Sequence, residues 1–358
     1  MRQAFSLGAA PHISIKLCRA FKSIYKHSLS LDHPSSMNTE LAIRQFFLLI
    51  SKSSQTDCDE DLVIRAMRTL ISVVGIPPHI LNEGLYLAAK VKFFQCVGFL
   101  VQEKGALFEE NALDKLFNEE DGHYTVKDMV EVVRAAYHQG HPFLGGLRWE
   151  YALRTLVYHS RTRSEEQDVI QVLPMIIPSP ETVADNELGL RALDVTLYHA
   201  AQNKLFDCVT HLAGEYSARF YDDALLNLLN AHPNFTFEDA MVVKDAVAGC
   251  CGLNPNATDE DGNTILHIYC ARVRTDARVK VDIGIVKAMV VWGVNPRIRN
   301  NHGTRGETAY IVLVKWGEPG STRQFSETEN TEMIEIIKYL LHAPDDGGRP
   351  QQSIDMQQ

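Results

Sequence analysis

The stretch that decides the fold is Asn254-Pro-Asn-Ala-Thr-Asp-Glu-Asp-Gly-Asn-Thr-Ile-Leu-His267, a polar loop that runs directly into an apolar segment. The tetrapeptide around its start, Gly252-Leu-Asn-Pro, recurs 41 residues later as Gly293-Val-Asn-Pro. About eight residues of that interval lie in an insertion at 271–281, and without them the spacing falls to about 33 residues, a period typical of stacked repeats. We therefore expect repeated structural units, each of which contacts only its neighbours.

Each part of this stretch favours a particular local conformation. Asp261-Gly262 is a turn signal, because glycine adopts positive φ without steric cost. Thr264 stands where the N-cap of a helix is wanted, and Gly293 stands where a helix ends in the left-handed conformation. The segment after Thr264 is apolar on more than one face, which is typical of a helix covered by neighbours before and after it.

The hexapeptide Gly262-Asn-Thr-Ile-Leu-His resembles the Gly-x-Thr-Pro-Leu-His of ankyrin repeats, with Ile265 in place of proline. The resemblance implies that His267 bonds back to the loop, as the histidine of ankyrin repeats does. The resemblance covers residues 236–343 and implies an all-α fold, an α-solenoid of about eight ankyrin-like helix pairs with hairpin-like loops in the C-terminal third. A third copy of the loop, at 301–310, holds about three extra residues relative to this period. A polar run at 318–330 then precedes a final helix that we expect to begin at Glu332.

The chain before this stretch also reads as helix pairs, although the Thr-Pro-Leu-His pattern is missing there. Second helices are predicted to begin near Asp61, Phe93 and Val126, at spacings of 32 and 33 residues. A larger repeat links residues 85–118 to residues 197–230, where 16 of 34 positions are identical at an offset of 112. Both copies carry an Ala-Ala pair, which ankyrin repeats use where two helices approach closely. The sequence therefore predicts that a block of about three units was duplicated.

Charge, hydrophobicity and cysteine usage narrow the class of protein. The 358 residues carry a net charge of −10, which argues against a nucleic-acid binder that depends on phosphate contacts. No apolar run reaches the roughly 18 residues that a transmembrane helix requires, so none is expected. The seven cysteines are scattered, which fits reduced thiols in a cytoplasmic compartment better than disulfides or a zinc site. No cofactor is predicted, and we expect a monomer.

We divide the chain into four segments: residues 1–36, 37–235, 236–343 and 344–358. The second holds divergent helical repeats, the third holds the recognisable ankyrin repeats, and the last is expected to be disordered. The first segment is basic, amphipathic and poor in acidic residues, which fits an organelle transit peptide or a membrane-surface helix. Two other interpretations are a helix packed on the first repeat and a start codon set too early, since Met37 opens the first clear helix.

A search for catalytic patterns finds no nucleophile elbow, phosphate loop or His-Glu-x-x-His sequence. His138 and His141 could seed a metal site, but residues at a helix end before a proline are more often caps. The carboxylates at 259–261 lack the twelve-residue loop that binds calcium. The alternative to a binding protein is an enzyme with an active site in residues 120–190, where the repeat spacing lengthens to about 40 residues. A deep pocket lined by convergent titratable groups would favour that alternative.

The function that we predict is a non-catalytic scaffold that binds another protein, with no nucleic acid, on its concave, loop-bearing face. The candidate binding residues are Thr258, Asp259, Glu260, Asp261, Tyr269, Arg272, Arg297, Arg299, Asn301 and His302. The first loop is acidic and the second basic, which favours a partner of mixed polarity, although the charges could also be merely solvated. Divergent repeats with single strong copies also resemble the ankyrin proteins that intracellular bacteria or viruses send into host cells. This second resemblance implies an effector that acts in the host cytosol.

Overall fold

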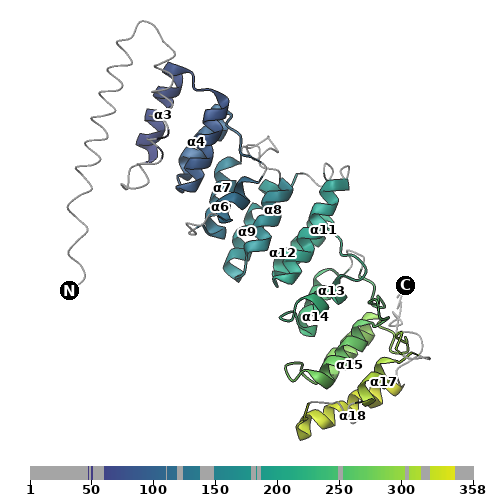
Figure 1. Ribbon diagram of the computed structural model, residues 1–358. Helices are drawn as coiled ribbons and strands as arrows, with labels where there is room; N and C mark the ends of the chain where they lie inside the picture. The colour runs from purple at the N-terminus through teal and green to yellow at the C-terminus, as the bar shows by residue number, and fades with distance from the viewer. Residues whose placement is uncertain are drawn as a thin grey trace, which may run out of the picture. The chain divides into compact units, whose positions relative to one another are not determined.

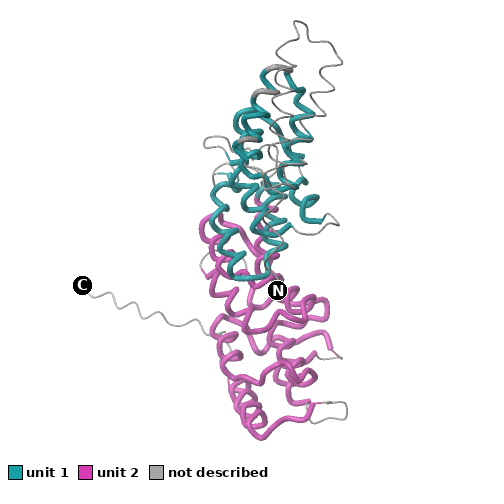
Figure 2. The backbone as a smooth tube through the Cα atoms, turned by 90° about the vertical axis from the view of Figure 1, so that its left-hand side faces the viewer, with its two compact units in different colours: residues 1–189 teal, residues 190–358 magenta. Residues whose placement is uncertain are grey.

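The computed structural model describes residues 47, 50, 60–109, 111–118, 124–137, 149–178, 183, 187–248, 253–302, 306–315 and 323–342. Figure 1 shows the helices of the chain, which falls into two compact units, residues 1–189 and 190–358 (Figure 2). In the described part every named element is a helix, and an isolated antiparallel bridge joins Arg299 to Thr308. The all-α prediction is therefore confirmed for these residues. None of their helices is long and apolar enough to cross a membrane.

Some of the predicted features lie outside the residues that the structure describes. These are the N-terminal segment 1–36, the tail 344–358, the candidate metal ligands His138 and His141, and all but two residues of the first expected helix at 40–51.

Unit 1 is built from the helices α3 (Glu60–Val74), α4 (Pro78–Lys90), α5 (Phe94–Gly98), the π-helix η1 (Phe99–Glu103), α6 (Ala112–Asn118), α7 (Val126–Ala136), α8 (Trp149–His159) and α9 (Arg163–Ile176). Figure 1 shows these helices following one another along the unit, and their contacts divide them into two rows. In one row α3, α5, α7 and α9 contact one another in turn, and in the other α4, α6 and α8 do so. Contacts between α4 and α5 and between α8 and α9 join the rows.

Unit 2 is built from the helices α11 (Glu187–Gln202), α12 (Phe206–Tyr216), α13 (Ala224–Ala231), α14 (Phe237–Ala246), α15 (Ile265–Thr275), α16 (Ile283–Trp292), α17 (Ala309–Val314) and α18 (Glu327–His342). Helix α11 begins just before the boundary between the units, which lies between residues 189 and 190. Again α12, α14, α16 and α18 contact one another in turn, while α15 contacts α17. Within each unit, successive helices of a row therefore pack against one another.

Three of these helices, α7 and α9 in unit 1 and α14 in unit 2, begin after a threonine that is followed three residues later by an acid. The threonine hydroxyl accepts a hydrogen bond from the backbone N–H of the acid, whose carboxylate accepts one from the N–H of the threonine. This exchange satisfies donors that every helix start leaves without an intrahelical partner. Such capping boxes begin α7 (Thr125 and Asp128), α9 (Thr162 and Glu165) and α14 (Thr236 and Asp239).

Two boundaries that bear on the candidate site differ from those predicted. Helix α15 extends to Thr275, so the insertion is a loop at 276–282 rather than 271–281. Helix α18 begins five residues before Glu332, because Ser326 caps it: the hydroxyl of Ser326 accepts from Glu329 N at 3.2 Å, and the Glu329 carboxylate accepts from Ser326 N at 2.9 Å. Part of the polar run is therefore the first turn of a helix.

The two copies of the duplicated block make the same turn after their first helix. Lys92, after α4, and Lys204, after α11, are 112 residues apart, and both have a φ of 62°. In the first copy Phe93 N donates to Ala88 O at 2.9 Å, and the matching bond in the second copy has the same length. The turn that follows α4 is therefore the turn that follows α11.

Candidate functional site

Two loops of unit 2, residues 256–263 and 295–302, lie side by side. We refer to them together as the paired-loop surface. Asn256 joins the loops at one end, because its Nδ2 donates to Gly293 O at 3.1 Å and its Oδ1 accepts from Asn295 N at 2.7 Å. These bonds tie the start of one loop to the start of the next.

The tips of the loops are also hydrogen-bonded to each other. Asn301 N donates to Asp261 O at 2.7 Å, and Asn300 Nδ2 donates to Asn263 Oδ1 at 2.9 Å. Gly262, with a φ of +76°, permits this approach, since a Cβ there would lie 3.0–3.1 Å from atoms of Asn301. The acidic and basic loops identified in the sequence therefore form one surface.

Asp259 supports its own loop rather than pointing outward. Its carboxylate accepts hydrogen bonds from Asp261 N at 3.0 Å, Asn263 N at 2.8 Å and Asn263 Nδ2 at 3.2 Å. This is the geometry by which an aspartate closes a turn on its own backbone. Of the three adjacent carboxylates, Asp259 is thus engaged within the loop, while Glu260 and Asp261 are exposed.

The exposed side chains of the paired-loop surface carry both signs of charge. Arg299 Nη1 donates to Gly306 O at 3.2 Å, so this arginine also contacts the backbone of the segment that follows the loop. The candidate residues that are exposed are Thr258, Glu260, Asp261, Arg297, Arg299, Asn301 and His302. An acidic edge therefore lies directly beside a basic one.

His267 lies beneath this surface and is 1% exposed. Its Nδ1 is 3.2 Å from Thr264 N and 2.8 Å from Thr264 Oγ1, and its Nε2 is 2.9 Å from Glu307 O. A carbonyl oxygen can only accept, so Nε2 carries the proton and Nδ1 accepts from Thr264. Burial lowers the pKa of His267, which favours this neutral form. The expected bond back to the loop is present, together with a second bond to the following loop.

Tyr269 lies in the interior instead of on the surface, with 0% of the residue exposed. Its hydroxyl accepts from Asp282 N at 2.8 Å and lies 3.1 Å from Lys280 O. Its ring meets Phe237 edge-on at 5.0 Å between centroids. Burial raises the pKa of the phenol. This side chain anchors the 276–282 loop and offers no surface to a partner.

Arg272 is half-buried near the other end of α15. Its Nη2 donates to Leu229 O at the end of α13, and its guanidinium lies over the Phe237 ring at 5.8 Å from the centroid. Burial lowers the pKa of Arg272 from its ordinary value. Tyr269 and Arg272 therefore belong to a different region from the paired-loop surface.

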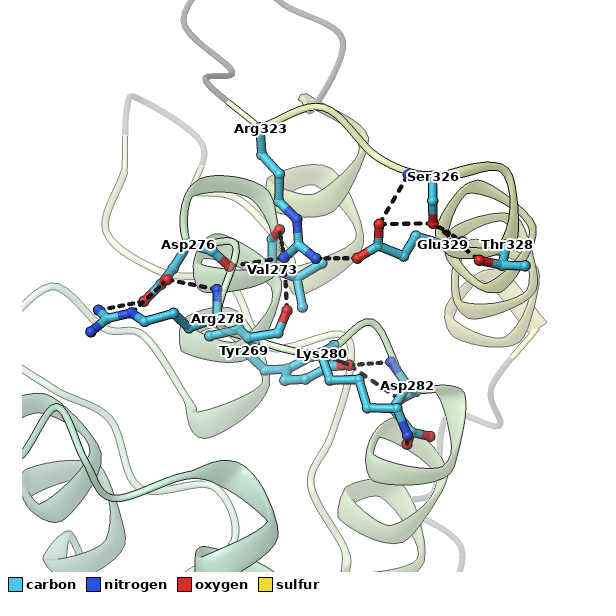
Figure 3. A network of polar contacts seen from close by, with 11 residues as sticks. Tyr269, Val273, Asp276, Arg278, Lys280, Asp282, Arg323, Ser326, Thr328 and Glu329 are labelled. Atoms are coloured by element: carbon cyan, nitrogen blue, oxygen red, sulfur yellow. Dashed lines mark hydrogen bonds and ion pairs between the residues drawn. The ribbon is translucent and has the colours of Figure 1, made fainter.

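Arg323, which no sequence pattern singled out, holds that region together (Figure 3). Its side chain is 5% exposed. Nη1 lies 2.9 Å from Val273 O, 2.8 Å from Asp276 O and 2.7 Å from Val279 O, and Nη2 pairs with the Glu329 carboxylate. The end of α15 and the 276–282 loop are thereby fixed to the start of α18. The Ser-x-x-Glu signal at 326–329 could have located the helix start, but not this contact.

Within residues 120–190, where an enzyme site was the alternative, the structure describes α7, α8, α9 and the start of α11. His159 of α8 stacks on Phe117 with ring centroids 3.6 Å apart, and burial lowers its pKa. Across the described residues, no group of three or more His, Cys, Asp or Glu side chains could hold a metal ion.

Comparison of the chain with protein-family models, with curated proteins and with solved structures finds no match.

Proposed function

We propose that this chain is an ankyrin-type solenoid that binds another protein, without catalysis, on the paired-loop surface. The observation that carries the proposal is the pair of loops itself. They are locked together by Asn256, Asn300 and Asn301, and they present their charged side chains outward. Loops held by a rigid scaffold are a common place for binding residues. The two-row contacts of the helices within each unit give further support for a solenoid.

The chemistry of the surface favours a partner whose own surface has both signs of charge. Glu260 and Asp261 would face its cations, and Arg297 and Arg299 its anions. Complementary charges of this kind steer association and fix the register of the partner more than they add affinity. The partner we propose is a cytoplasmic protein, in the host cytosol if the chain is an effector.

Affinity capture with the full chain as bait tests the proposal. The variant Glu260→Lys/Asp261→Lys/Arg299→Glu reverses the exposed charges while leaving Asp259, which holds the loop, in place. We expect the partner recovered by the unmodified chain to fall about tenfold, the loss that corresponds to about 1.4 kcal/mol of binding free energy. Quantitative mass spectrometry of the captured proteins provides the measurement.

A matched control reverses a charge pair elsewhere in unit 2. Glu335 and Lys338, on α18, are both more than half exposed and lie 2.9 Å apart, so Glu335→Lys/Lys338→Glu keeps their pairing. The control should capture the same partner as the unmodified chain. If the paired-loop variant, shown by circular dichroism to be folded, captures every partner undiminished, the proposed surface is wrong.

A further inference from the structure

A cavity of about 430 Å³ opens in unit 2 between the connection from α13 to α14 and the 276–282 loop. We call it the insertion cavity; among its lining residues are Phe237, Glu238, Tyr269, Arg272, Lys280 and Ile285. Its volume lies within the roughly 300–1,000 Å³ typical of sites that enclose a ligand. None of its residues belongs to the paired-loop surface. The paired-loop surface lies at the start of α15 and the insertion cavity near its end, and the 11 residues of this helix span about 16 Å.

The floor of the cavity is apolar and aromatic. Phe237 and Ile285 are 3% and 8% exposed, and Phe237 packs edge-on against the buried ring of Tyr269. The guanidinium of Arg272 covers the Phe237 ring from one side. Such a floor suits an apolar or aromatic side chain that enters from solvent.

The rim of the cavity presents cations. The side chains of Arg278 and Lys280 are 78% and 70% exposed, whereas the carboxylates that pair with them, Asp276 and Asp282, are each 29% exposed. Both carboxylates are drawn inward by backbone bonds: Asp276 Oδ1 accepts from Arg278 N at 2.9 Å, and Asp282 Oδ1 accepts from Gly284 N at 2.8 Å. Arg278 pairs with Asp276 through Nε at 3.0 Å and Nη2 at 2.9 Å, and Lys280 Nζ lies 2.7 Å from Asp282 Oδ2, while most of each cationic side chain is open to solvent.

Glu238 is the opposing charge on the rim. It is exposed at the start of α14, and its carboxylate acts electrostatically on Lys280. Among the lining residues the three cations Arg272, Arg278 and Lys280 stand against the two acids Glu238 and Asp276, so the opening keeps an excess of positive charge that favours an anion.

The loop that forms the rim is held in place before anything binds. Arg323 donates to the carbonyls of Asp276 and Val279, and the Tyr269 hydroxyl accepts from the backbone N–H of Asp282 (Figure 3). A site that is already ordered loses less conformational entropy when it binds a ligand.

We propose that the insertion cavity binds an acidic peptide segment. One aromatic side chain of the segment lies over Phe237 and Ile285, and flanking carboxylates pair with Arg278 and Lys280. This second site is independent of the paired-loop surface and goes beyond the function proposed above.

Fluorescence anisotropy with the full chain and a fluorescein-labelled Glu-Glu-Phe-Glu-Glu peptide tests the proposal. We expect saturable binding that Lys280→Glu and Arg278→Glu each weaken about tenfold, since each replaces an attraction by a repulsion. Glu238→Gln should strengthen binding about twofold to threefold, because it removes the opposing charge. A gain of affinity cannot arise from damage to the fold. Glu238→Gln therefore tests the site even if Arg278→Glu disturbs the loop.

The controls separate this site from general attraction to charge. Lys338→Glu, an exposed reversal on α18, should bind the peptide as the unmodified chain does. Lys-Lys-Phe-Lys-Lys and Glu-Glu-Ala-Glu-Glu should bind at least about fivefold more weakly, for want of the charge and of the aromatic ring respectively. The proposal fails if no saturation occurs below about 1 mM, if either control peptide binds as tightly, or if Lys280→Glu and Glu238→Gln change nothing.

Discussion

The two copies of the duplicated block, residues 85–118 in unit 1 and 197–230 in unit 2, share the turn after their first helix but differ in the helix that follows it. At the turn after the first helix, Lys92 and Lys204 adopt the left-handed conformation, which is about 1–2 kcal/mol unfavourable for a residue other than glycine. Each lysine Nζ lies 2.8 Å from a capping-box carboxylate, that of Asp128 or Asp239. The same ion pair thus accompanies the same strained turn in both units.

The copies differ in the helix that follows this turn. In unit 2 it is an unbroken α-helix, α12, whereas in unit 1 the equivalent residues are α5 followed by the π-helix η1. Gln102 of η1 donates to Ala135 O at 3.0 Å and Tyr137 O at 3.1 Å, at the end of α7, and its counterpart in unit 2 is Gly214, which has no side chain to do so. Equal length and shared sequence therefore do not fix the helix type where a side chain bonds to the neighbouring pair.

The largest effect is expected when a matched core side chain is removed from each copy of the duplicated block, which tests whether the two copies are structurally equivalent. Leu85→Ala and Leu197→Ala each delete a fully buried group and should each lower the free energy of unfolding by about 2–5 kcal/mol. Hydrogen exchange measured by mass spectrometry reads the two units separately. Leu107→Ala, at a side chain 51% exposed, is the control and should change stability by less than about 0.5 kcal/mol. Losses that differ between the two sites by more than about 2 kcal/mol would break the equivalence.

The capping boxes provide the next test. Thr125→Ala and Thr236→Ala should each destabilise their own unit by about 1 kcal/mol, because each leaves a helix donor without its acceptor. Denaturant unfolding followed by hydrogen exchange measures the loss in each unit. Thr→Ser at the same positions keeps the hydroxyl and should restore most of the stability. An equal loss in the serine variants would show that the threonine methyl group, and not the cap, is responsible.

A smaller effect distinguishes the copies at glycine. Gly214→Ala should stabilise unit 2 by about 0.5–1 kcal/mol, since glycine is unfavourable within a helix and a Cβ there meets nothing within 4 Å. Gly98→Ala in α5 should gain less, because the new Cβ would lie 3.4 Å from Ala135 O. Thermal unfolding of the two variants measures the difference. Greater stabilisation at Gly98 would contradict the close approach of α5 to α7.

The smallest effect concerns acid. Burial acts to raise the pKa of Asp128, but the hydrogen bonds from Lys92 and Thr125 outweigh it and hold the pKa below the ordinary 3.8. The stabilisation is therefore complete above pH 3.8 and is lost as the pH falls through the lower pKa of the folded state. The ion pair is partly exposed, so screening by solvent keeps the effect small. Asp128→Asn should remove this acid-dependent part of the stability of unit 1, measured by denaturant unfolding between pH 5 and pH 2. An unchanged pH dependence would overturn the assignment.

Local signals predicted much of the recognisable repeat. Gly293 ends α16 with a φ of 111°, and Thr264 begins α15 with a capping box that uses His267 as its third-position partner. These features depend on residues within one or two helical turns of one another, and a sequence displays such residues together.

The candidate site was predicted less completely. The loops at 258–261 and 297–302 were identified, and the structure joins them, but Asp259 and Tyr269 are engaged inside unit 2. Both residue types are common on binding surfaces, so composition could not separate an outward side chain from an inward one. The distinction depends on acceptors and donors that the fold supplies.

By itself, the sequence determined the helical class of the described residues, most of their helix starts and the duplicated block. Caps and glycine turns depend on residues close together in the chain, and a duplication is visible when the sequence is aligned with itself. Only the tertiary structure decided that Arg323 fixes the 276–282 loop and that a cavity opens beneath it. The carbonyls that Arg323 contacts lie 44 to 50 residues earlier in the chain, and no local preference encodes a contact over that separation. It arises only when the α15–α16 pair packs against α17 and α18, which brings these groups into a shared, largely buried position.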